Sequence, residues 1–121
     1  MSTVIDYQSK IKKYKRILKH DSDSVEANGE LGKIYLRIGD YKTAVEYLEK
    51  VIDVKPDLEG INDVLFDVYR ELGDLRKARP CLERMVEKNP DNIEYLKSLG
   101  FIYYDQGELD SALTTYHKAL N

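Results

Sequence analysis

A period of thirty-four residues runs through most of this chain and limits what it can fold into. Shifting the segment from Leu31 to Pro56 forward by this distance reproduces its pattern without any insertion. The aligned sets are Leu31, Leu65 and Leu99; Tyr35, Tyr69 and Tyr103; Gly39, Gly73 and Gly107; and Ala44, Ala78 and Ala112. A fixed period of this length is produced by stacked copies of one supersecondary unit. The sequence therefore predicts a repeat array.

Composition narrows the class of protein further. The 121 residues include 19 basic and 22 acidic side chains, a net charge of −3, which provides no overall attraction to nucleic acid. The single cysteine, Cys81, cannot form an internal disulfide and fits a reducing compartment. No apolar run reaches the roughly 18 residues of a spanning helix, and the first residues lack a secretory pattern. We expect a cytoplasmic protein without membrane insertion.

Each unit is expected to contain two helices, because its apolar residues recur at spacings of three and four. Gly39 should end a first helix in the left-handed conformation, and Asp40 should cap the next helix. The expected helices are 25–38, 41–54, 59–72, 75–88, 93–106 and 109–120. One solenoid domain, 1–121, would then contain repeats at 25–58, 59–92 and 93–121.

Residues 1–24 follow the same register and predict a half repeat. Their apolar residues align with the second helix of a repeat and favour a helix over 5–20; they are Tyr7, Ile11, Tyr14, Ile17 and Leu18. Lys10 takes the place of Ala44, which requires that the neighbouring helix be missing or displaced. Residues 1–20 have a net charge of +5. This basic helix could bind anionic membranes or nucleic acid, but a solvated face docking on an acidic surface is favoured.

Packing inside the repeats should depend on small residues. Gly32 or Gly100 on a first helix is expected to face Ala44 or Ala112 on the second, which brings the helices close together. Leu31, Tyr35 and Leu48 are then expected to fill the groove against the following unit. Phe66 replaces the glycine in the second repeat and should hold its helices further apart. Asp91 and Glu94 have the spacing of a capping box.

The recurring pattern is Leu-Gly-x-x-Tyr, then Gly, Ala, an apolar or aromatic residue and Pro. This pattern resembles the tetratricopeptide repeat, with three full repeats and an N-terminal half repeat. The tryptophan position of that family is occupied by Asn28, Asn62 and Leu96. The resemblance implies an all-α, right-handed solenoid of antiparallel helix pairs, with about seven helices. It also implies a non-catalytic adaptor or scaffold that binds a protein or peptide in its concave groove. The alternative, a pentatricopeptide-like RNA reader, has longer and more basic units.

The repeat register predicts which side chains face the groove. Phe101 and Tyr104 are large and are not required by the repeat, so they could anchor an apolar side chain. Lys97 and Arg70 beside them could hold a carboxylate. The alternative is that the two aromatic residues only cover the solenoid end or lie half-exposed. The predicted peptide-binding residues are Lys33, Arg37, Asp67, Arg70, Lys97, Phe101 and Tyr104.

Some tetratricopeptide proteins clamp a C-terminal carboxylate with lysines, asparagines and an arginine. Among the corresponding positions, only Lys33 has suitable chemistry, and Glu94 would repel a carboxylate; the positions are Gly29, Lys33, Val64, Glu94 and Ser98. We therefore expect this chain not to be a receptor of that type.

Nothing in the sequence indicates catalysis. His20 and His117 lie 97 residues apart without ligands at metal-binding spacing. The glycines form no phosphate-binding loop. Cys81 is interpreted as a surface or partly buried residue without nucleophilic function. We expect no enzyme activity, no cofactor and no metal.

The ends of the solenoid predict a second function. Stacked repeats need polar terminal caps, and the last repeat should leave Tyr95, Leu99, Tyr103 and Tyr116 partly uncovered. Exposed patches of this kind favour association. The alternative function is a structural self-assembly unit that forms homo-oligomers through its uncapped ends.

Overall fold

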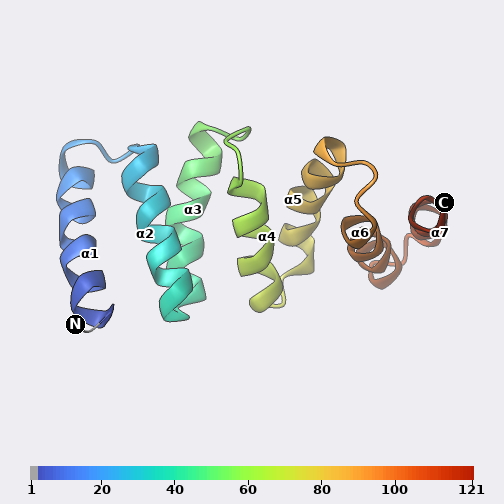
Figure 1. Ribbon diagram of the computed structural model, residues 1–121, viewed down its shortest axis with the longest axis horizontal. Coiled ribbons are helices and arrows are strands. Elements are labelled where there is room, and N and C mark those ends of the chain that lie inside the picture. Colours follow the sequence, from blue (N-terminus) through green and yellow to red (C-terminus); the bar gives the residue numbers. More distant parts are fainter. Residues whose placement is uncertain (1–2) are drawn as a thin grey trace.

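The chain folds into a row of helices. A computed structural model describes residues 3–121, and over this range it contains seven α-helices: α1 Thr3–His20, α2 Val25–Ile38, α3 Tyr41–Val54, α4 Ile61–Glu71, α5 Leu75–Lys88, α6 Ile93–Asp105 and α7 Leu109–Leu120. The helices stand side by side in chain order, and their axes turn progressively until α7 is seen almost end-on (Figure 1). The prediction of an all-α solenoid is confirmed.

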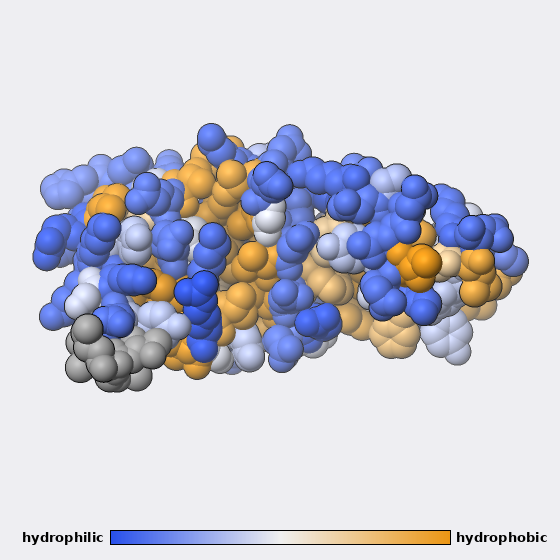
Figure 2. Space-filling view, in the orientation of Figure 1, coloured by the Kyte–Doolittle hydropathy of each residue, from blue (hydrophilic) through white to orange (hydrophobic). Residues whose placement is uncertain are grey.

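Each helix packs on its neighbours in the sequence. Packing is most extensive within the pairs α2–α3, α4–α5 and α6–α7, and α1 packs on α2 much as α3 packs on α4. The basic side chains of α1, including Lys10, are exposed. In Figure 2, hydrophilic residues predominate over α1, and apolar residues emerge near α3 and α4 and again near α6 and α7. The charged N-terminal end therefore differs from the more apolar C-terminal end.

Short polar turns separate the helices inside each pair. Gly39 and Gly73 have φ values of 93° and 74°, in the left-handed region that glycine tolerates. Asp40 accepts a hydrogen bond from a backbone N–H group and caps α3, as predicted, and Asp74 caps α5 in the same way. In the third pair the equivalent residue is Glu108, whose carboxylate binds Arg79 of α5 and makes no side-chain cap bond.

The start of α4 and the cap of α6 differ from the predictions. Helix α4 begins at Ile61, two residues later than predicted, because Gly60 adopts the left-handed conformation with a φ of 85°. Leu58 and Glu59 consequently belong to the turn. The capping-box prediction was wrong: Asn92 caps α6 by accepting a hydrogen bond from the backbone N–H of Tyr95, because the helix begins one residue later than that pattern requires.

The core runs continuously from α3 to α6, and further buried side chains lie on α2 and α7. Leu31, Leu48, Leu65 and Leu82 are each at most 1% exposed. Leu48 is the side chain that comes nearest to Gly32: a Cβ placed on Gly32 would lie 2.5 Å from its Cγ. Tyr116 is likewise the side chain nearest to Gly100. The glycines therefore admit one large side chain from the second helix.

A repeated hydrogen bond joins consecutive repeats. The hydroxyl of Tyr69 on α4 donates to Glu49 Oε2 on α3 over 2.6 Å, and that of Tyr103 on α6 donates to Glu83 Oε2 on α5 over 2.8 Å. In both bonds the glutamate acceptor lies on the preceding unit. Lys77 Nζ lies 3.5 Å from Glu49 Oε2 and completes the first of these joints.

Removing the Tyr69 hydroxyl should weaken the first joint. Burial, followed by the hydrogen bond to Glu49, raises the pKa of Tyr69 above its ordinary value of 10. The neutral phenol therefore contributes stability that is fully present below pH 10 and is lost at higher pH. We expect Tyr69→Phe to lower the free energy of unfolding at pH 7 by about 1–3 kcal/mol and to reduce its decline above pH 10.

Urea unfolding at pH 7 and pH 10.5 measures both effects. Tyr104→Phe is the matched control, because the Tyr104 side chain is 62% exposed. Equal stability of Tyr69→Phe and the control at both pH values would contradict the prediction.

Candidate functional site

The first helices of the three pairs, α2, α4 and α6, form a surface that we call the groove face. A pocket of about 310 Å³ opens between α4 and α6 on this surface. We call it the aromatic pocket; its lining residues are Phe66, Arg70, Leu75, Lys97, Ser98, Phe101 and Ile102. Aromatic rings and aliphatic side chains with two cations among them can hold an apolar side chain next to an acidic group.

The two cations of the aromatic pocket differ in their surroundings. Arg70 lies 3.2 Å from the Asp67 carboxylate, and its guanidinium carbon lies 5.5 Å from the centre of the Phe66 ring. Lys97 is exposed and forms no ion pair with any of the residues that the structure describes. Lys97 is therefore the cation that can accept an anionic ligand group without giving up a partner.

The structure brings together some of the residues that the sequence predicts for the site. Arg70, Lys97 and Phe101 line one pocket, and Asp67 is joined to it through Arg70. Phe101 is 53% exposed, so its ring is accessible. Tyr104, Lys33 and Arg37 are also exposed but do not line the aromatic pocket.

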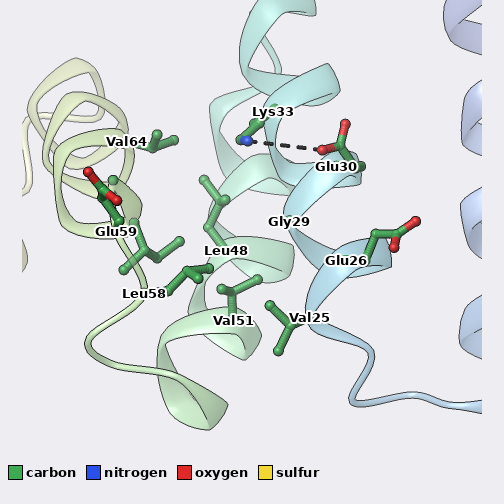
Figure 3. Close-up of a pocket in the computed structure, with 12 residues that line it drawn as sticks. Val25, Glu26, Gly29, Glu30, Lys33, Leu48, Val51, Leu58, Glu59 and Val64 are labelled. Carbon is green, nitrogen blue, oxygen red and sulfur yellow. Dashed lines mark ion pairs between the residues drawn. The ribbon is translucent and has the colours of Figure 1, made fainter.

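A second pocket, of about 230 Å³, lies between α2 and α4, with α3 beneath it (Figure 3). Its floor is apolar and its rim carries the carboxylates of Glu26, Glu30 and Glu59. We call it the acidic-rimmed pocket; the other lining residues are Val25, Gly29, Lys33, Leu48, Val51, Leu58, Gly60, Ile61 and Val64. Lys33 Nζ lies 4.0 Å from Glu30 Oε1, so a carboxylate of the same helix already partners this ammonium.

Sequence reasoning missed half of this second pocket. The helix was predicted to begin at residue 59, whereas Glu59 belongs, with Leu58, to the turn that precedes Gly60. The signal for this turn was the Pro-Asp-Leu-Glu-Gly sequence from Pro56 to Gly60, in which a glycine follows four residues after a proline. Phe66 was likewise predicted only as a bulky spacer, yet it is buried and lines the aromatic pocket.

The Cys81 thiol is buried and is poorly placed to act as a nucleophile. Cys81 is 3% exposed, so its interpretation as a surface or partly buried residue was wrong: it lies in the core between packed helices. Burial raises the pKa of its thiol to about 11, which keeps the thiol protonated at neutral pH. Within the described part of the chain, no three His, Cys, Asp or Glu side chains gather closely enough to hold a metal ion.

The apolar surface at the C-terminal end agrees with the prediction in part. Tyr95, Tyr103 and Tyr116 are half-buried, and so partly uncovered as predicted, whereas Leu99 is buried. Exposed leucines that were not predicted lie on α7: Leu109, Leu113 and Leu120. Their equivalents on α5, one period earlier, are Leu75, Arg79 and Val86, which are partly buried. None of the helices over residues 3–121 combines the length and the apolar character that crossing a membrane requires.

Comparisons with known proteins agree with this architecture. Sequence models of the tetratricopeptide repeat match residues 25–58 and 64–120, so the chain belongs to the tetratricopeptide repeat family. No curated protein sequence matches it.

Several solved structures have the same fold. A crystal structure of MamA is 29% identical and aligns over 98% of this chain and 69% of its own, with a TM-score of 0.73. MamA 41-end from Desulfovibrio magneticus RS-1 is 25% identical and aligns over 97% of this chain and 66% of its own, with a TM-score of 0.69. YrrB, described as a TPR protein with an unusual peptide-binding site, is 26% identical. It aligns over 97% of this chain and 60% of its own, with a TM-score of 0.79. This chain therefore spans about 60–69% of the length of these proteins.

Proposed function

We propose that this chain is a non-catalytic interaction module that binds a peptide or protein segment along its groove face. The observation that carries the proposal is the aromatic pocket, where Phe101 is accessible and Lys97 has no ion-pair partner among the described residues. An apolar side chain of a ligand would fill the pocket, and a neighbouring carboxylate would approach Lys97. The proposed binding residues are Lys33, Arg37, Asp67, Arg70, Lys97, Phe101 and Tyr104.

The family and its structural neighbours support this proposal. YrrB has the same fold and is described as having a peptide-binding site. The groove face of this chain also has the physical character of a binding surface, because apolar hollows alternate with exposed charges along the first helices of three successive pairs. The chain would act by holding its ligand, and we propose a cytoplasmic location for this activity.

The test is selection of peptides from a random library displayed on phage. We expect the native chain to enrich peptides that the Lys97→Ala/Phe101→Ala variant does not retain. The matched control is Leu113→Ala/Lys118→Ala, which removes an exposed apolar residue and an exposed lysine from α7, outside the groove face. Equal enrichment on the native chain and both variants would exclude the groove face as the binding surface.

A second candidate function is self-association through α7. The leucines at 109, 113 and 120 are 60%, 61% and 81% exposed, and large exposed apolar side chains on one helix favour contact with another copy. Sedimentation over a dilution series distinguishes the two functions. A module that only binds ligands keeps the mass of one chain at every concentration, as does its Lys97→Ala/Phe101→Ala variant, whereas a self-assembly unit gains mass as concentration rises.

A further inference from the structure

The two pockets of the groove face have opposite charges at their rims. The acidic-rimmed pocket carries three carboxylates and one ammonium, and that ammonium, on Lys33, is partnered by Glu30. Glu26 and Glu59 are both exposed, and neither forms an ion pair with a described residue. The aromatic pocket is lined by two cations and no carboxylate; Arg70 is paired with Asp67, which lies outside the lining, and Lys97 has no ion-pair partner among the described residues. The charge of the groove face therefore changes from negative at the acidic-rimmed pocket to positive at the aromatic pocket.

Each pocket alone favours a different neighbour for the apolar side chain that it holds. Figure 3 shows Glu26 and Glu30 on α2 on one side of the first pocket and Glu59 on the opposite side, with Leu48, Val51 and Leu58 between them. An apolar residue seated on this floor would place its sequence neighbours among carboxylates, which favours lysine or arginine there. In the aromatic pocket, Lys97 favours aspartate or glutamate next to the apolar anchor.

Helix α4 separates the two pockets and sets their spacing. It contributes Ile61 and Val64 to the acidic-rimmed pocket and Phe66 and Arg70 to the aromatic pocket. These pairs lie roughly 8 Å apart along the helix at 1.5 Å per residue, and crossing the helix adds roughly 10 Å. The resulting diagonal of roughly 13 Å corresponds to about four residues of extended chain at about 3.3 Å per residue.

We propose that the ligand is one extended segment with two apolar anchors about four residues apart, of which one has basic neighbours and the other has acidic neighbours. The anchor with basic neighbours seats between α2 and α4, and the anchor with acidic neighbours seats between α4 and α6. This inference rests on the proposed function, since it specifies the ligand of the same groove face.

Seven-residue peptides with blocked ends test the inference by fluorescence anisotropy at 0.15 M salt. The mixed peptide Lys-Leu-Lys-Ser-Asp-Leu-Asp and its reverse cover both chain directions. Comparison peptides carry lysine at all four charged positions, or aspartate at all four. We expect one mixed peptide to bind at least about fivefold more tightly than either comparison peptide, because only the mixed peptide complements both rims.

Charge reversal on the protein makes the test specific. Glu59→Lys should weaken binding of the mixed peptide and strengthen binding of the all-aspartate peptide, because it reverses one carboxylate of the acidic rim. Lys97→Glu should strengthen binding of the all-lysine peptide instead. Glu87→Lys and Lys118→Glu are the controls, since both residues are exposed and line neither pocket. We expect these two variants to keep the order of affinities of the native chain.

The outcomes separate this inference from the proposed function. The inference would be overturned if the mixed and comparison peptides bound with equal affinity while binding of the library peptides still required Lys97 and Phe101. The proposed function would then still stand. The inference would also be overturned, and the proposed function left standing, if the mixed peptides did not bind while library peptides without the paired charges did bind. If no peptide from either source binds the groove face, both the inference and the proposed function are wrong.

Discussion

Replacing Leu48 with alanine is expected to lower the free energy of unfolding by about 2–5 kcal/mol. The Leu48 side chain is 1% exposed and lies directly over Gly32, where an added Cβ would be 2.5 Å from its Cγ. Because glycine has no side chain that could move into the vacated space, the site can collapse only by shifting helices. We therefore expect a cost in the upper half of this range, measured by urea or thermal unfolding.

The matched control for this substitution is Leu113→Ala. Leu113 is also a helical leucine, but it is 61% exposed on α7. Its truncation should change the free energy of unfolding by at most about 0.5 kcal/mol. If Leu48→Ala were as harmless as Leu113→Ala, the close contact between α2 and α3 would not exist in solution.

Two glycines on the same helix should respond to alanine with opposite signs. At Gly32 the added Cβ would overlap Leu48, which is fully buried, so we expect a net loss of stability of about 1–3 kcal/mol. At Gly29 the nearest atom is Val51 Cγ2 at 3.9 Å, which is an ordinary contact. Gly29→Ala should therefore be stabilising by about 0.5–1 kcal/mol through the better helix propensity of alanine.

Coupling with Leu48 identifies the cause of the loss at Gly32. In the Leu48→Ala background the overlap disappears, so Gly32→Ala should become neutral or stabilising. Thermal unfolding of the four variants of this cycle provides the measurement. Destabilisation by Gly32→Ala of equal size in both backgrounds would show that the close approach of Leu48 is not the reason.

The repeat period was enough to predict most of the fold. It placed the apolar stripes, and the Gly-Asp pairs at 39–40 and 73–74 defined where one helix ends and the next begins. The period could not show which residue meets Gly32, because Ala44 and Leu48 lie one turn apart on the same face of α3. It also could not reveal the left-handed Gly60, since the other two repeats have no glycine at this position.

The candidate site was only partly predictable for a related reason. Residues on one helix face could be read from the register, which grouped Arg70, Lys97 and Phe101, and these three residues line the aromatic pocket. The pockets, however, also use residues from turns and second helices, such as Leu58, Leu75 and Leu48. Their positions depend on where α4 begins and on how the helices twist, and neither follows from apolar spacing alone.

The tyrosine–glutamate bonds make the joints between units unequal in strength. Tyr69 and Tyr103 each find a glutamate on the preceding helix, but the position equivalent to Glu49 and Glu83 on α1 is Lys15, whose ammonium cannot accept a hydrogen bond. Tyr35 stacks on Tyr47 within its own pair instead. Because extensive packing is confined to helices that follow one another, tension applied to the two ends would pass through the joints in series. Under such tension the seam between α1 and α2 would have to hold without the tyrosine–glutamate bond that reinforces the two later seams.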